Sequence, residues 1–273
     1  MRAHLVQMDV VWEDKGANRA TAERLISAAG VERGDLVVLP EMFETGFSMN
    51  VERTADVGGE GSAWMSSMAS RFGVTLMGGI SVRGEDGWGL NRALVFDGGG
   101  REVGRYDKVH PFSYGREAER FRGGGRVCVC GWKTPENKGE TRVCPIVCYD
   151  LRFPELFRAG RMLGGEVFVV MANWPSERVE HWLALLRARA IENQAIVLGV
   201  NRVGKDPYLS YPGASVAFDG KGERVAFGGA EECVVGVEVD VGACRAWREA
   251  FPAWSDVKRG LLPRVDVGGE FEV

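Results

Sequence analysis

The sequence lacks any long run of apolar residues, and this absence limits what the protein can be. Its apolar stretches all fall short of the roughly eighteen residues that a membrane-spanning helix needs. Charged residues interrupt the N-terminal segment MRAHLVQMDVVWEDKG too early for the apolar core of a signal peptide. The sequence therefore predicts a protein without a membrane partner, and we expect it in the cytoplasm.

The chain also lacks a strong excess of charge of either sign. It has 34 Lys and Arg residues against 38 Asp and Glu residues, which gives a net charge of -4. A nucleic-acid-binding protein or a protein that binds anionic membranes usually carries a clear positive excess. We therefore expect neither partner, and expect a small-molecule substrate instead.

Internal repeats, long linkers and low-complexity segments are missing as well. The 38 glycines are scattered, and the clusters at 97–100 and 122–125 lie between strand-like runs, as turns do. A chain of 273 residues is long enough to bury a sizeable core. We predict a single domain over residues 1–273.

Paired cysteine knuckles, the usual sign of a zinc site, do not occur. Cys128 and Cys130 have the spacing C-x-C, and Cys144 and Cys148 have the spacing C-x3-C, whereas zinc ribbons use C-x2-C pairs. The sequence therefore predicts no metal site. Without an export signal, the six cysteines are expected to be reduced thiols.

Histidine is scarce, which argues against a cysteine–histidine hydrolase. His4 lies in the first predicted strand and His181 on a predicted helix, where structural roles are expected. His110 follows Lys108 by two positions, so we expect it to support that lysine. The sequence around each cysteine resembles neither the papain nor the caspase pattern.

What the chain does contain is an alternation of short apolar runs with amphipathic stretches. Helices are predicted over 18–30, 62–73 and 176–195, the last with a serine cap, and another begins at Pro154. About a dozen strands lie between and after them, so the pattern is typical of an α/β layered protein. The main strand-like runs are 3–8, 35–41, 74–82, 92–98, 102–110, 126–132, 141–150, 166–174 and 196–204.

Four of these strands end in polar or reactive side chains. Glu41, Lys108, Cys148 and Asn173 each stand at the C-terminal end of an apolar run. Ligands of open α/β sheets bind beyond the carboxyl ends of the strands, so these four residues are expected to meet. A carboxylate can take the proton of a thiol, and a lysine can lower the thiol pKa and stabilise an oxyanion. Cys148 is therefore a candidate nucleophile, whereas the other five cysteines fit buried packing positions.

Three segments resemble the signatures of the nitrilase superfamily, the carbon–nitrogen hydrolases. They are VVLPEMFETGF, YDKVHPF and PIVCYDLRFPELFR, in the family's order, and the similarity extends over almost the whole chain. The resemblance implies a four-layer α-β-β-α sandwich that often pairs into homodimers and needs no cofactor. It also implies Glu41 as general base, Lys108 as oxyanion holder and Cys148 as nucleophile. A second glutamate is typical, for which we favour Glu117 and keep Glu119 as the alternative.

Within that family the sequence is most similar to the ω-amidases. These enzymes hydrolyse 2-oxoglutaramate or 2-oxosuccinamate to the acid and ammonia; another superfamily substrate, such as an N-carbamoyl amino acid, a nitrile or deaminated glutathione, is the alternative. Arg152 is a candidate for the anionic end of the substrate, with an internal salt bridge as its other reading. The backbone N–H of Tyr149 is expected at the oxyanion. The expected pocket walls, each of which also fits core packing, are Phe43, Phe112, Tyr114 and Trp174.

Two expectations concern details of the site. A glutamate that acts as base and acid should have a raised pKa, so we expect this for Glu41. The glycine-rich segment FRGGGRV and the stretch GWKTPENKGETRVCP are expected to form a variable hairpin. This hairpin is expected to shape substrate access without contacting the catalytic residues.

Overall fold

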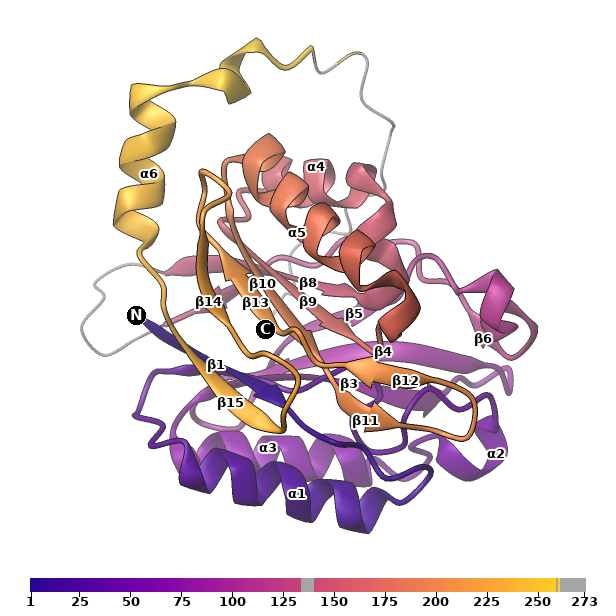
Figure 1. Ribbon diagram of the computed structural model, residues 1–273. Helices are drawn as coiled ribbons and strands as arrows, with labels where there is room; N and C mark the ends of the chain where they lie inside the picture. Colours follow the sequence, from indigo (N-terminus) through magenta and orange to yellow (C-terminus); the bar gives the residue numbers. More distant parts are fainter. Residues whose placement is uncertain (134–139, 259, 261–273) are drawn as a thin grey trace.

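The computed structural model describes residues 1–133, 140–258 and 260. Two β-sheets lie face to face at its centre, and helices cover the outer face of each sheet (Figure 1). This arrangement confirms the predicted four-layer α-β-β-α sandwich. None of the helices in the described ranges is both long and apolar enough to cross a lipid bilayer.

The first sheet is formed by strands within residues 2–122 together with one strand from 233–238, and it is covered by α1 (Lys15–Ala28) and α3 (Glu60–Phe72). Strands β1, β2 and β3 are parallel to one another, and β15 and β4 flank them in the antiparallel direction. The edge strand β5 pairs antiparallel with β4. A short strand, β6 (Phe121–Arg122), also pairs with β4. The strand order is β15 (Cys233–Glu238), β1 (Arg2–Gln7), β2 (Leu36–Val38), β3 (Thr75–Arg83), β4 (Gly89–Phe96) and β5 (Glu102–Asp107).

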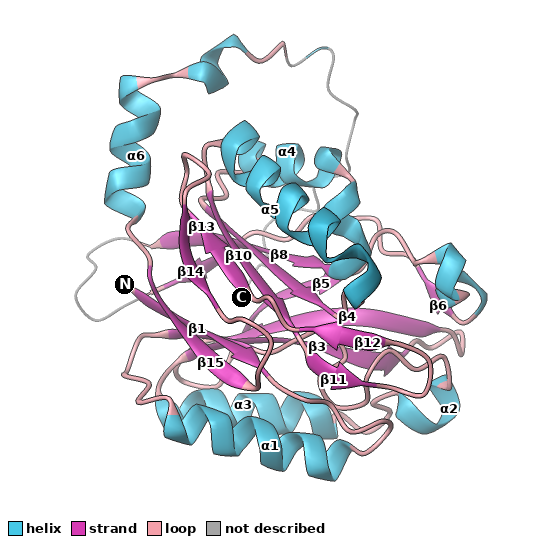
Figure 2. Cartoon of the chain, viewed as in Figure 1, coloured by secondary structure: helices cyan, strands magenta, loops and turns pink. Residues whose placement is uncertain are grey.

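The second sheet is covered by α4 (Pro154–Met162) and α5 (Val179–Asn193), as Figure 2 shows. Its central strands β8, β9 and β10 are parallel. A separate hairpin, β11 (Val203–Lys205) and β12 (Ser210–Pro212), follows β10. The strand order is β14 (Arg224–Phe227), β13 (Val216–Phe218), β10 (Ile196–Asn201), β9 (Val167–Ala172), β8 (Thr141–Val147) and β7 (Cys130–Trp132).

The remaining helices are short or lie at the end of the chain. They are α2 (Val51–Thr54), α6 (Val241–Ala250) and the 3-10 helices η1 (Ser113–Gly115), η2 (Glu117–Glu119), η3 (Cys148–Arg152), η4 (Ser176–Arg178) and η5 (Ala253–Asp256).

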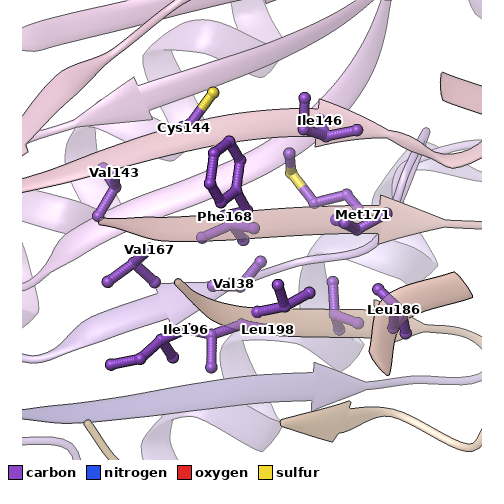
Figure 3. Packing of buried hydrophobic residues seen from close by; sticks show 14 of the residues in the cluster. Val38, Val143, Cys144, Ile146, Val167, Phe168, Met171, Leu186, Ile196 and Leu198 are labelled. Carbon is purple, nitrogen blue, oxygen red and sulfur yellow. The ribbon is translucent and has the colours of Figure 1, made fainter. Parts of the chain in front are cut away.

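The main core lies between the two sheets and continues beneath α4 and α5. Successive side chains of a strand point to opposite faces, so β2 directs Leu36 and Val38 toward the second sheet and Val37 toward α1 and α3. The central cluster in Figure 3 joins Val38 to Phe168 of β9 and Leu198 of β10. Side chains of both sheets therefore share one core.

Most predicted elements are present, with a few differences. The run predicted as one strand over 196–204 divides into β10 and β11, which belong to separate sheets. Only Cys130–Trp132 of the strand predicted over 126–132 is extended and paired, as β7. The serine cap predicted at Ser176 is wrong, because a 3-10 turn precedes α5 and Arg178 stands at the N-cap position. The Ser176 hydroxyl instead donates a hydrogen bond to the Ser210 carbonyl. Pro154 begins α4 as predicted.

Candidate active site

The four predicted strand-end residues meet at one edge of the sandwich. The Lys108 Nζ lies 2.9 Å from the Glu41 Oε1. The Asn173 backbone N–H donates to the Glu41 Oε2 at 2.9 Å, and the Cys148 Sγ lies 3.9 Å from the Asn173 carbonyl oxygen. The prediction that the strand ends converge is therefore confirmed by the geometry.

Close backbone packing places Glu41 at this edge. Met42, the next residue, has a positive φ of 43°, and the chain turns sharply after β2. The Phe43 N–H donates to the Gly79 carbonyl of β3 at 3.0 Å. A Cβ atom on Gly79 would lie 2.8 Å from the Glu41 Cα, so only glycine permits this approach.

Lys108 is held between two buried carboxylates. Its Nζ lies 2.8 Å from the Glu117 Oε2, in addition to its contact with the Glu41 Oε1. Asn91 of β4 completes the group, because its Nδ2 donates to both Glu41 Oε1 and Glu117 Oε1 at 2.8 Å. All four side chains are almost completely buried. The sequence analysis missed Asn91, whose only signal is an amide within the apolar run of β4.

The structure distinguishes the two alternatives for the second glutamate. Glu117 begins the 3-10 helix η2 and is fully buried, and it also accepts a hydrogen bond from the Phe112 N–H at 2.6 Å. Glu119 is exposed and pairs with Arg116 at 2.8 Å. Only Glu117 joins the lysine cluster.

The pKa values of the two buried glutamates shift in opposite directions. Burial pushes the pKa of Glu41 upward, but the Lys108 charge and the hydrogen bonds from Lys108, Asn173 and Asn91 outweigh burial, so its pKa lies below the ordinary value. Burial raises the pKa of Glu117, and the nearby Glu41 charge adds to that rise against the opposing effect of Lys108. The expected upward shift at Glu41 is therefore wrong, and it falls on Glu117 instead.

Cys148 stands at a strained turn between β8 and the 3-10 helix η3. Its φ of 44° is unusual for a residue with a side chain, and such strain gathers at functional sites. Burial raises the pKa of its thiol, the charge and hydrogen bond of Glu41 raise it further, and the lowering effect of Lys108 does not compensate. The resting pair is therefore a neutral thiol beside an ionised Glu41, with Lys108 too weak to generate a thiolate by itself.

A cavity of about 760 Å³ opens onto this cluster. Lys108 and Cys148 line the cavity, and Glu41 and Glu117 are bonded to Lys108. We call this buried group of four residues the inner end, and the part of the cavity toward solvent the mouth. The predicted wall residues Phe112, Tyr114 and Trp174 line the cavity, and so do Tyr149 and Arg152, which were predicted to bind the oxyanion and the acid end of the substrate. Further lining residues that the sequence analysis missed include Trp12, Phe47, Arg178, Tyr208 and Tyr211.

Phe43 was predicted to line the pocket, and this prediction is wrong. Its side chain is fully buried between the first sheet and its covering helices. The ring packs against Trp64 of α3, with 5.4 Å between the ring centroids. Phe47, four residues further along, contributes the aromatic surface to the cavity instead.

Arginines and aromatic rings meet in the mouth of the cavity. The Arg152 guanidinium lies 4.9 Å from the Trp174 ring centroid, and its Nη2 is 3.3 Å from the His181 Nδ1. Within the described ranges, Arg152 forms no ion pair with a carboxylate. Arg178 lies over the Phe112 ring at 5.8 Å and forms an ion pair with the exposed Glu177 at 3.4 Å. The mouth therefore presents two guanidinium groups, of which Arg178 has an exposed carboxylate partner and Arg152 has none among the described residues.

Carboxylates also line the mouth, but three of them are already engaged. Glu13 accepts a hydrogen bond from the Ser48 hydroxyl at 2.6 Å. Asp206 accepts from the backbone N–H groups of Tyr208 and Leu209, both at 2.7 Å. Glu119 pairs with Arg116, as described above. These internal bonds reduce the repulsion that the acids would exert on an anionic ligand.

Each of the three histidines contacts another side chain of the protein outside the Glu41–Lys108–Cys148 group. The His4 Nε2 lies 2.8 Å from Asp35, and His181 faces Arg152. His110 does not contact the Lys108 side chain as expected, because its Nδ1 lies 2.7 Å from Asp150 and its ring stacks on Phe153. In the part of the chain that the structure describes, no three His, Cys, Asp or Glu side chains form a possible metal site.

The glycine-rich segment contacts the backbone beside the inner end, contrary to expectation. The Gly124 N–H donates to the Lys108 carbonyl at 2.8 Å. A Cβ atom on Gly124 would lie 2.3 Å from the Asp107 carbonyl oxygen. Residues 134–139 of the predicted variable hairpin lie outside the described residues.

Comparisons with known proteins agree with this geometry. The carbon–nitrogen hydrolase family model matches residues 2–249. The chain is 36% identical over 258 residues to Omega-amidase YafV of Escherichia coli K12, covering 94% of this chain and 96% of that protein. It is 30% identical over 258 residues to 2-oxoglutaramate amidase of Bacillus subtilis, covering 94% and 97%.

A solved structure that is 35% identical in sequence to this chain has the same fold. XC1258 from Xanthomonas campestris, a CN-hydrolase superfamily protein with an arsenic adduct in its active site, superposes with a TM-score of 0.86 at 35% identity. The alignment covers 94% of this chain and 97% of that one.

Proposed function

This chain belongs to the carbon–nitrogen hydrolase family of the nitrilase superfamily and is an amidase, and from that premise we propose its substrate and mechanism. It hydrolyses the ω-amide of small 2-oxo acid amides, 2-oxoglutaramate and 2-oxosuccinamate, to the dicarboxylic acid and ammonia. The observation that carries the proposal is one cavity that joins the buried Glu41–Lys108–Cys148 group to an arginine without a carboxylate partner. The names of the E. coli and B. subtilis relatives support the same substrate class.

In the first step Glu41 removes the proton of Cys148 while the sulfur attacks the amide carbon. Because the Glu41 pKa is lowered and the thiol pKa is raised, the carboxylate is ready to accept a proton that the thiol still holds. The transfer therefore takes place together with attack, since a free thiolate is unfavourable in this buried position.

Attack moves the carbonyl electrons onto oxygen, which becomes an oxyanion. Lys108 holds that charge. Burial alone would lower the pKa of Lys108, but the charges of Glu117 and Glu41 outweigh burial and raise it, so the ammonium stays protonated. The Tyr149 N–H is the second donor. It belongs to the first turn of η3, where backbone N–H groups lack acceptors within the helix.

Collapse of this intermediate breaks the carbon–nitrogen bond. Glu41, now protonated, gives its proton to the departing nitrogen, and ammonia leaves behind a thioester on Cys148. Glu41 is again a carboxylate and takes a proton from water, whose oxygen attacks the thioester carbon. The acid leaves, the proton returns to the Cys148 sulfur, and both residues regain their starting forms.

Glu117 acts in this scheme by holding Lys108 and Asn91. Its two oxygens bond to both residues and to the Phe112 N–H, so Glu117 and Glu41 hold the lysine together.

The mouth selects the acid end of the substrate. Arg152 stacks on Trp174 and offers its fork of donors to a carboxylate, and Arg178 provides a second cation on the Phe112 side. Phe112, Tyr149 and Trp174 form apolar walls for the short carbon chain between the two polar ends. Tyr114, which is 87% exposed, stands at the rim.

Three further predictions belong to this proposal. Residues 1–273 form a single domain, which is supported by the shared core between the two sheets. Two copies pair as a homodimer, in keeping with the family resemblance. The protein acts in the cytoplasm, which is consistent with six free cysteines.

The proposal is tested by ammonia release across a substrate panel. The panel contains 2-oxoglutaramate, 2-oxosuccinamate, an N-carbamoyl amino acid, a nitrile and deaminated glutathione at equal concentrations. We expect the highest kcat/KM with the two ω-amides. Negligible turnover of both, together with clear turnover of another compound, would assign that compound's activity to the chain instead.

A further inference from the structure

Asp150 is a buried carboxylate that the mechanism above does not use. It lies two residues after Cys148 in η3, is fully buried and does not line the cavity. Its Oδ2 accepts a hydrogen bond from the Tyr106 hydroxyl at 2.6 Å and from the Val109 N–H at 3.1 Å. Its Oδ1 accepts from the His110 N–H at 2.8 Å and contacts the His110 Nδ1 at 2.7 Å.

All these donors flank Lys108 in the sequence. We call residues 106–110 the lysine segment. Asp150 therefore ties the turn that carries the nucleophile to the segment that carries the lysine. On its other sides, the Lys108 N–H donates to the Asn91 carbonyl at 2.9 Å, and the Lys108 carbonyl accepts from Gly124. The segment is thus bonded to Asn91, Gly124 and Asp150, and the Asp150 bonds connect it to the turn that carries Cys148. The His110 ring adds an apolar contact with Phe153, directly after η3.

We propose that Asp150 is a positioning residue that fixes Lys108 relative to Cys148, so that the lysine ammonium lies where the oxyanion forms. This inference rests on the proposed function, because it takes Lys108 as the group that holds the oxyanion. Asp150 never touches the substrate. It acts through the lysine segment, and catalysis is sensitive to displacements of about 1 Å in such groups.

A carboxylate suits this position because it only accepts hydrogen bonds. Its two oxygens provide about four acceptor sites, and four donors surround them here. An asparagine would keep one oxygen but place an NH2 group against two of these donors. The Tyr106 hydroxyl can rotate to accept, whereas the Val109 N–H cannot, so the lysine segment would move away from η3.

The experiment compares two reactions of Cys148 in an Asp150→Asn variant. Amide hydrolysis builds an oxyanion, but alkylation by iodoacetamide does not, so only hydrolysis depends on the position of Lys108. We expect kcat for amide hydrolysis to fall about 100-fold, with KM nearly unchanged. Alkylation of Cys148, followed by mass spectrometry of its peptide, should keep almost the wild-type rate.

Asp35→Asn is the matched control. Asp35 is also a buried aspartate, bonded to His4 and to the Glu32 N–H, and it lies just before β2, whereas Glu41 follows that strand. This variant makes the same chemical change and should leave both reactions close to wild type. Tyr106→Phe is the milder variant, which removes one of the four bonds and should lower hydrolysis several-fold while sparing alkylation.

Each outcome decides the proposal. Hydrolysis that falls while alkylation persists supports it. Equal loss of both reactions in Asp150→Asn would mean that Asp150 merely holds the cysteine turn, and unchanged hydrolysis would show that Lys108 needs no such tie. If Asp150→Asn does not fold, folded Tyr106→Phe with unchanged hydrolysis overturns the proposal. The kcat of each variant is divided by that of the wild type, with whichever amide the wild type hydrolyses as substrate. If the proposed substrate is wrong, the wild type alone reveals it by failing to hydrolyse 2-oxoglutaramate and 2-oxosuccinamate.

Discussion

The inner end and the mouth of the same cavity are built in contrasting ways. At the inner end, every charged side chain is buried and bonded to at least one other member of the group, as Lys108 is to Glu41 and Glu117. In the mouth, Arg152 and Arg178 lie on aromatic rings with few polar partners. The side chains of the inner end are therefore held in place before the substrate binds, whereas the guanidinium groups in the mouth have N–H donors that a substrate carboxylate can accept from.

This difference separates chemistry from selection. A network of buried charges tolerates little change, because removal of one member leaves another charge without its partner. Cations on the half-exposed walls of a mouth can change with smaller consequences for folding. Substitutions at the inner end should therefore lower kcat, and substitutions in the mouth should change KM.

The largest expected effect is that of Glu41→Gln. The glutamine cannot accept the Cys148 proton, so we expect kcat to fall about 1,000-fold, within the usual range for a lost general base. Glu44→Gln is the matched control, since Glu44 is also buried but pairs with Arg19 away from the cavity lining. Steady-state ammonia release measures both, and a Glu41→Gln variant with near-wild-type kcat would remove Glu41 from its proposed role.

The pH dependence should also reflect the inner end. The active form of Glu41 is the carboxylate, and its pKa in the folded protein lies below the ordinary value of 4.5. Activity should therefore persist as the pH falls from neutral and be lost only below pH 4.5. The kcat/KM profile measures this, with circular dichroism to exclude acid unfolding. An acidic limb centred near about pH 6 would indicate a raised pKa, as for the catalytic acid of lysozyme, and would contradict the account.

Arg152→Ala should have an intermediate effect that is confined to binding. Loss of a charged hydrogen-bond partner of the substrate carboxylate costs about 1.5–3 kcal/mol, so KM should rise about 10- to 100-fold with kcat nearly retained. Arg101→Ala is the control, since Arg101 is an exposed arginine that pairs with Asp97 away from the cavity lining. With an uncharged aliphatic amide as substrate, Arg152→Ala and wild type should behave alike. A loss of kcat with either substrate would place Arg152 in the inner end instead.

The smallest expected effect concerns Gly124. An added Cβ atom would lie 2.3 Å from the Asp107 carbonyl oxygen, so Gly124→Ala must displace the lysine segment. We expect a loss of about 1–3 kcal/mol in the free energy of unfolding and a modest fall in kcat. Gly125→Ala, where an added Cβ atom meets nothing within 4 Å, should match wild type in both. Urea unfolding measures the difference, and equal stability of the two variants would refute the close contact.

The sequence allowed the inner end to be predicted largely because its residues follow apolar strands. Strand ends of a layered α/β fold converge, so Glu41, Lys108 and Cys148 were found from position alone. Asn91 was missed because it lies within a strand, where one amide looks like any other polar residue on a sheet. The direction of the Glu41 pKa shift could not be predicted from the sequence. It depends on whether the Lys108 charge and the hydrogen bonds to the carboxylate lower the pKa more than burial raises it.

The mouth was harder to predict, because its residues come from loops without a regular period. Phe43 and Phe47 are four positions apart, and only the turn after β2 determines which one enters the core and which one lines the cavity. His110 was assigned to Lys108 from its spacing, but the fold brings Asp150 within reach of its ring from η3. Contacts between segments so far apart in the sequence leave no local signal.

Ammonia release from 2-oxoglutaramate by wild type and by a Cys148→Ala variant tests the central claim most directly. Cys233→Ala serves as the control, because Cys233 lies in β15 and is absent from the cavity lining. The account predicts turnover by wild type and by Cys233→Ala, and a loss of at least about 1,000-fold in Cys148→Ala, as expected when a nucleophile is removed. Turnover that survives in Cys148→Ala would contradict the claim that this buried cysteine carries out the hydrolysis.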